Sequence, residues 1–127
     1  MDVTQALADL TEISSQIEAA VLFDEVGRVA GSTLSEEAAQ RLAEAAGELL
    51  SRAGSVADGG EVTQVEASTP DGSVFVVREG PQRIAATTGP DPTIGLVFYD
   101  LKSCLRGATE SPKRRRGAKK EADGDEA

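Results

Sequence analysis

The chain has 127 residues, a formal net charge of −9 at pH 7, one cysteine and no histidine. One cysteine excludes a disulfide framework and a thiolate metal cluster, and the lack of histidine removes the commonest general base and metal ligand. The length fits one domain with one modest core, and no run of about 18 apolar residues is present to span a membrane. Because the chain begins with a polar run rather than a signal peptide, we expect a cytoplasmic protein. Because histidine and a thiolate cluster are missing, we expect no metal and no cofactor.

The charge is unevenly distributed along the chain. Residues 1–106 carry seven Lys/Arg against 17 Asp/Glu, a balance of −10, whereas residues 107–127 carry six basic and five acidic side chains. The second segment has too few apolar side chains to fold alone. We therefore predict a domain over residues 1–106 and a disordered basic and acidic tail over 107–127. The acidic domain would repel phosphate backbones and lipid head groups, so nucleic-acid and membrane binding are not expected.

The first third of the chain predicts a helix followed by a β-hairpin. Apolar residues recur at helical spacing from Val3 to Ile13, with Asp2 placed to cap the helix. Residues 17–23 are apolar on both faces, as in a central strand covered on both sides. A turn at residues 24–27 leads to a returning strand over 28–32.

The next predicted helix, Glu36 to Ala53, has an unusually wide apolar arc. A capping box over residues 33–36 opens it, and Gly54 with the glycines that follow ends it. On a helical projection the apolar residues span about 160°, wider than the stripe of about 100° needed to pack once against a core. One half of the arc centres on Leu42, Ala45 and Leu49, and the other contains small residues suited to a second helix. A position deep within the domain is the alternative, but a chain this small has little interior. The small-residue half predicts a dimer contact through Ala39, Ala43, Ala46 and Leu50.

The rest of the domain predicts three strands and a closing helix. A polar, Val/Thr-rich strand over residues 61–69 has the weak patterning of an edge, and we expect it to add Val62 and Gln64 to the dimer contact. Turns at residues 70–72 and 80–81 separate it from strands over 73–78 and 82–88. From Ile94 to Arg106 the helical spacing returns, and Leu96 and Tyr99 fall off its apolar face as a possible partner patch.

The resulting order is α-β-β-α-β-β-β-α, and residues 2–106 resemble the roadblock (dynein light chain) family. Three segments carry the resemblance: residues 18–24 with Gly27, residues 70–77, and residues 91–101, where a glycine–leucine–aliphatic helix follows an aspartate. The resemblance implies an α+β fold, a profilin-like α/β/α sandwich with a five-stranded antiparallel sheet. It also implies a dimer in which the middle helices pack antiparallel and the third strands join at their edges. Bacterial members often act on a Ras-like small GTPase, and others serve as dynein subunits or adaptors.

No segment of the sequence predicts catalytic chemistry. The glycines between Gly27 and Thr33 lack the lysine of a phosphate loop, and Cys104 lies on an apolar helix face without a histidine to activate it. Arginine fingers stabilise GTPase transition states, but the arginines here are expected to be surface side chains; the candidates are Arg28, Arg52, Arg78 and Arg83.

Three classes of function follow, with an enzyme the least supported. The first is a dimeric regulator, an activator or co-regulator, of a bacterial Ras-like GTPase, and the second is a non-catalytic adaptor in a signalling or motility complex. Activation, exchange and scaffolding are not distinguished, nor is a homodimer from a heterodimer with a paralogue. The basic run Lys113 to Lys120 contains no aromatic residue to stack bases, and a solubilising or tethering role is expected for it.

Overall fold

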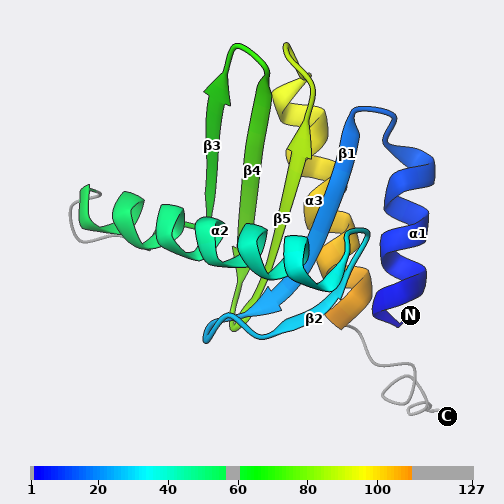
Figure 1. The fold of residues 1–127 in the computed structure, drawn as a ribbon, viewed down its shortest axis with the longest axis horizontal. Helices are drawn as coiled ribbons and strands as arrows, with labels where there is room; N and C mark the ends of the chain where they lie inside the picture. The colour runs from blue at the N-terminus through cyan, green and yellow to red at the C-terminus, as the bar shows by residue number, and fades with distance from the viewer. Residues whose placement is uncertain (1, 57–60, 110–127) are drawn as a thin grey trace, which may run out of the picture.

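The computed structural model describes residues 2–56 and 61–109 and has three layers. Five strands form one antiparallel sheet in the order β2-β1-β5-β4-β3. Helices α1 and α3 cover one face, and α2 crosses the other (Figure 1). The predicted order and fold class are confirmed. The elements are α1 (Val3–Ile13), β1 (Ile17–Asp24), β2 (Val29–Ser32), α2 (Glu36–Val56), β3 (Gln64–Thr69), β4 (Gly72–Glu79), β5 (Gln82–Thr88) and α3 (Ile94–Thr109).

The strands occupy the positions that their polarity predicts. In β1 every residue from Ala19 to Phe23 is buried, because helices lie on both faces and β2 and β5 pair with its two edges. In β3 each residue is half-buried or exposed, and the strand pairs only with β4. An interior strand can afford apolar residues on both faces, whereas an edge strand keeps polar ones.

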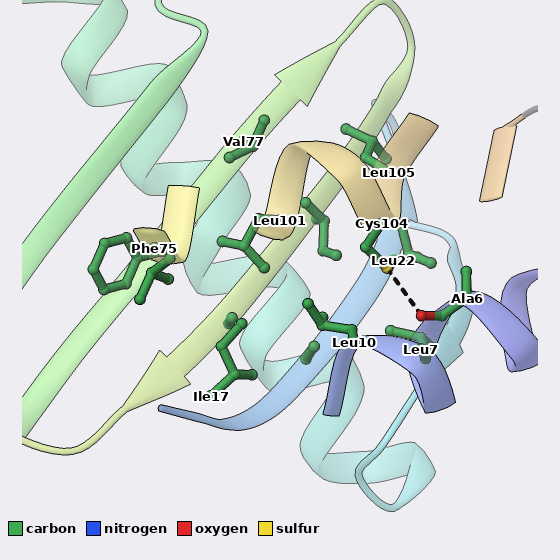
Figure 2. Close-up of a cluster of buried hydrophobic side chains, with 14 of the residues drawn as sticks. Ala6, Leu7, Leu10, Ile17, Leu22, Phe75, Val77, Leu101, Cys104 and Leu105 are labelled. Carbon is green, nitrogen blue, oxygen red and sulfur yellow. Dashed lines mark hydrogen bonds between the residues drawn. The ribbon is translucent and has the colours of Figure 1, made fainter. Parts of the chain in front are cut away.

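The larger part of the core lies between the sheet and the pair α1 and α3. Figure 2 shows leucines from both helices meeting aliphatic and aromatic side chains of the sheet. Phe75 of β4 contacts Phe98 of α3 edge-to-face, with ring centroids 5.0 Å apart. Such an aromatic pair adds about 0.5–1.5 kcal/mol beyond its burial. This packing fixes α3 on the sheet and so fixes which of its residues face outward.

Several local predictions need correction. The α2 N-cap is Ser35, whose Oγ accepts a hydrogen bond from the Ala38 backbone N–H at 3.3 Å. The Thr33 hydroxyl accepts instead from the Ala20 N–H of β1 at 3.0 Å. Helix α2 continues through Gly54 to Val56.

The ends of the other helices also differ from the prediction. Helix α3 extends to Thr109, three residues beyond the predicted domain boundary. Ile13 and Ile94, placed on apolar helix faces by their spacing, are 73% and 47% exposed because each lies in a terminal turn. The glycines at residues 59–60 and most of the predicted tail, 110–127, lie outside the described residues, and the domain division stays a prediction.

Candidate functional site

The four α2 residues predicted as a dimer contact face the chain's own sheet. Ala39, Ala43, Ala46 and Leu50 are between 0% and 7% exposed within a single chain. They form one cluster with Val21, Phe23, Val76 and Ala85. Small side chains allow α2 to approach the sheet closely, which is the same property that suggested a helix partner. The prediction is therefore corrected, since this face is already filled by the protein itself.

The other half of the apolar arc remains open. Leu42 and Leu49 are half-buried at the edge of the cluster, and Ala45 is exposed. Val56, in the last turn, is 85% exposed. We call these four residues the open side of α2. A helix with an apolar stripe left uncovered in a single chain is typical of a protein-interaction surface.

The open side adjoins a part of the α2 face of the sheet that α2 leaves uncovered. Figure 1 shows the ends of β3 and β4 near their connecting turn extending past α2. Val65 and Val74 are half-buried on the α2 face of these strands. The unpaired edge of β3 lies beside them, where Gln64 is exposed and Val62 precedes the strand half-buried. The open side of α2, the apolar sheet face at Val65 and Val74, and the unpaired edge of β3 thus adjoin one another.

A second apolar surface lies at the beginning of α3. Leu96 is 49% and Tyr99 is 68% exposed, as their positions on the helical projection predict. The segment before the helix is held in place, because the Thr93 N–H donates to Gln16 Oε1 at 2.6 Å. The patch is therefore presented by a fixed helix end. Its role in partner binding stays a prediction.

Two titratable groups with shifted pKa values, Cys104 and Asp24, have structural roles. Cys104 is 8% exposed, and its thiol donates to the Ala6 carbonyl at 3.4 Å (Figure 2). Burial raises its pKa to about 11, which disfavours the reactive thiolate. Asp24 Oδ1 accepts from the Arg28 and Val26 N–H groups in the first hairpin, and these bonds lower its pKa.

The described part of the chain contains neither a metal-binding cluster nor a membrane-spanning helix. Within residues 2–56 and 61–109, no three His, Cys, Asp or Glu side chains converge in a way that could hold a metal ion. No helix in these ranges is long and apolar enough to cross a membrane.

Comparison by sequence finds no matching family model and no matching curated protein. Comparison by structure finds the fold in several solved proteins. A Roadblock/LC7 domain from Streptomyces avermitilis has a TM-score of 0.77 at 22% identity, covering 84% of this chain and 94% of that chain. MglB from Myxococcus xanthus has a TM-score of 0.71 at 16% identity, covering 84% and 91%. LokiProfilin2, solved in a complex with rabbit actin, has a TM-score of 0.60 at 15% identity, covering 83% and 93%.

The predicted resemblance is confirmed at the level of the fold. The chain has the Roadblock/LC7 fold in its profilin-like three-layer form. The matched regions span most of each neighbour's length, so the likeness includes all three layers rather than one supersecondary motif. At identities below 25%, what the neighbours share with this chain is the arrangement of helices and strands.

Proposed function

We propose that the protein is a dimeric, non-catalytic regulator of a Ras-like small GTPase that acts by protein–protein binding. The observation that carries the proposal is the fold, which the chain shares with MglB, a GTPase regulator. A regulator of this type needs apolar surfaces for its partners. The open side of α2 and the α3 patch are two such surfaces.

The first surface fits a second copy of the chain. Pairing two open sides antiparallel would bury Leu42 and Leu49 of both copies and cover Val65 and Val74 of each sheet. Joining the β3 edges would satisfy backbone groups that are unpaired in one chain, with Val62 and Gln64 at the start of the contact. Such an interface is isologous and closes as a C2 dimer. It retains the predicted dimer mode but uses the other half of the apolar arc of α2.

The second surface is the proposed contact for the GTPase. Leu96 and Tyr99 are three residues apart and share one exposed face of α3. A partly exposed tyrosine beside aliphatic side chains is a frequent anchor in protein interfaces. The patch lies on the sheet face opposite α2 (Figure 1), so dimerisation through α2 would leave it free.

GTP hydrolysis tests the proposal directly. The turnover and nucleotide exchange of a Ras-like GTPase encoded beside this chain's gene are measured with and without the protein. We expect binding together with a change in one of these rates. Tyr99→Ala should weaken binding, whereas Val26→Ala, which removes a similarly exposed apolar side chain at the β1–β2 turn, should not. Binding with unchanged rates would favour the adaptor function, and an absence of binding would refute the GTPase as partner.

A further inference from the structure

A cleft of about 510 Å³ lies on the α2 face of the sheet, along the side of α2 that faces away from its open side. Phe23, Arg78 and Arg83 of the sheet line it. Gly47 and its neighbours on α2 form one wall, and the β1–β2 turn at Glu25 forms the other. The volume falls within the range of small-molecule sites. Nothing in the proposed dimer or in the α3 patch uses this cleft.

Two arginines stand directly opposite each other beside the cleft. Arg78 of β4 and Arg83 of β5 are cross-strand partners in the antiparallel register. Like charges at such positions destabilise a sheet. Partial burial lowers the pKa of the Arg83 guanidinium, and the charge of Arg78 lowers it further. The register follows from the two-residue turn at Gly80 and Pro81, so the sequence contained a signal for this pair.

The two guanidinium groups are only partly satisfied by the protein. The Arg78 side chain is 22% exposed, and its Nη2 lies 3.3 Å from Glu61 Oε1. The same nitrogen is buried and makes no hydrogen bond. Arg83 Nη1 donates to the Gly80 carbonyl at 3.1 Å. Since a guanidinium carries five N–H donors, both side chains retain donors that could bind a ligand.

Most acidic side chains at the cleft are engaged elsewhere. Asp24 accepts from two backbone N–H groups of its own turn. Glu48 pairs with Arg52, with 3.0 Å between Glu48 Oε2 and Arg52 Nη2, and Glu44 lies 3.5 Å from the Gln40 amide. Glu25 and Asp24 attract Arg83 electrostatically, but neither forms an ion pair with it. The carboxylates that line the cleft therefore do not neutralise the arginine pair at close range, and the ion-pair partner of Arg78, Glu61, lies outside the cleft lining.

We propose that this cleft is a binding site for a small ligand with an oxyanion group, either phosphate or carboxylate, held between Arg78 and Arg83. The planar guanidinium fork matches both groups in a bidentate geometry. An anion between the two arginines would also remove their mutual repulsion. The carboxylates around the rim favour a ligand that carries little further negative charge. The site is independent of the proposed GTPase contact.

The test uses the full chain with inorganic phosphate and, separately, acetate as probes, both at constant ionic strength. The side-chain Nε–Hε resonances of the arginines are followed by NMR, and affinities are measured by calorimetry. Arg78→Gln and Arg83→Gln remove the two charges one at a time. Arg41→Gln is the matched control, because it removes an exposed arginine of α2 whose acidic neighbour, Glu37, does not line the cleft. The two probes distinguish a phosphate-bearing from a carboxylate-bearing ligand.

We expect the Arg78 and Arg83 resonances of the unaltered chain to shift on titration with at least one probe. Each cleft variant should bind that probe about tenfold more weakly or worse, as for the loss of a charge-assisted contact. The Arg41 variant should bind normally. Equal affinity in all three variants, or no shift at Arg78 and Arg83 with either probe, would overturn the proposal.

Discussion

At the scale of single residues, the contact between α1 and β2 depends on Gly31. A Cβ placed there would lie 2.2 Å from Val3 Cγ1 and 3.3 Å from Leu7 Cδ1. Val3 is β-branched and stiff at χ1, so it cannot simply rotate away. We expect Gly31→Ala to lower the free energy of unfolding by about 1–3 kcal/mol, the usual range for overpacking. Urea denaturation followed by circular dichroism measures it.

Gly54→Ala is the matched control for this substitution. Gly54 lies within α2, and a Cβ there meets nothing within 4 Å. Alanine is better than glycine in a helix by up to about 1 kcal/mol, so the control should be neutral or stabilising. If Gly31→Ala proved as stable as this control, α1 would pack less closely on β2 than the structure shows.

The thiol of Cys104 gives a second prediction at this scale. With a pKa of about 11 in the folded protein against 9.0 for an unperturbed thiol, its thiolate fraction at pH 8 is lower by roughly 100-fold. Disulfide-reagent kinetics at pH 8 should therefore be slower by at least this factor in the folded than in the denatured chain. The folded-state rate should rise steeply as the pH increases toward 11. A fast, pH-insensitive reaction of the folded protein would show that the thiol is not buried as described.

The same shift affects stability in alkaline solution. Because the folded-state pKa is raised above the unfolded value, the folded protein holds its thiol proton over a range in which the unfolded chain has lost it. The contribution of this group to stability is thus fully present below about pH 9 and is lost as the pH rises through about 11.

At the scale of secondary structure elements, two adjacent α2 residues distinguish the dimer surface from the core. Leu42 lies on the open side and is half-buried, whereas Ala43 is 1% exposed against the sheet. Leu42→Glu should leave a folded chain that sediments as a monomer. Ala43→Glu would force a carboxylate between α2 and the sheet, at the wall of the arginine cleft, and this overpacking should lower the free energy of unfolding by about 1–3 kcal/mol. Sedimentation velocity and circular dichroism check both variants.

The two variants also decide between the predicted and the corrected interface. If Ala43→Glu gave a folded monomer, the dimer contact would lie on the sheet-facing side of α2, as the sequence predicted. The unaltered chain should sediment as a dimer at roughly tens of micromolar, a concentration at which a stable dimer persists. A monomer under these conditions would contradict the proposed dimer altogether.

The elements themselves were predictable because their signals are local. Short apolar or Val/Thr-rich runs between turns locate the strands, helical spacing locates the helices, and the turn residues at Pro70, Gly72 and Gly80 separate the last three strands. The position of β3 at an edge followed from its polarity. In such a chain the order of elements is set by neighbouring residues, and periodicity detects it.

The side of α2 that faces the sheet was not predictable from the same signals. The residues in both halves of its apolar arc are suited to burial. The helical projection does not show which half the sheet covers. That choice depends on how α2 crosses the strands, which is a tertiary property. Small side chains, as at Ala39, Ala43 and Ala46, favour close approach to a sheet and to a helix alike. The α2 cap was misassigned for a similar reason, since Thr33 and Ser35 are both good caps and tertiary pairing with β1 occupies Thr33.

At the scale of the whole molecule, the three layers separate the proposed surfaces. The open side of α2 and the arginine cleft lie on one sheet face, along opposite sides of the same helix, and the α3 patch lies on the other face. A dimer formed along the open side would leave both remaining surfaces accessible. One small fold could then hold a second copy, a protein partner and a small anion at once.

The balance of charge over the whole chain gives the last prediction. The basic run Lys113 to Lys120 could attract DNA or an anionic membrane, but residues 1–106 carry a balance of −10 and residues 107–127 are nearly neutral as a whole. We expect repulsion to exceed attraction, so the full chain should bind DNA and anionic vesicles weakly or undetectably at physiological ionic strength. Fluorescence anisotropy and vesicle co-sedimentation measure this. A variant with glutamine at 113–116 should behave in the same way.

Salt titration shows whether the tail acts alone. Contacts made by the basic run would weaken as the Debye length falls from about 10 Å at 0.1 M salt to about 3 Å at 1 M. A chain that ends at Thr109, where α3 ends, should fold and dimerise like the full chain, because alanine is the only hydrophobic residue type among residues 110–127. Tight, salt-sensitive binding by the full chain that is lost in both altered chains would contradict the expectation and make the basic run a targeting element. Unfolding of the shortened chain would instead place the domain boundary later than residue 109.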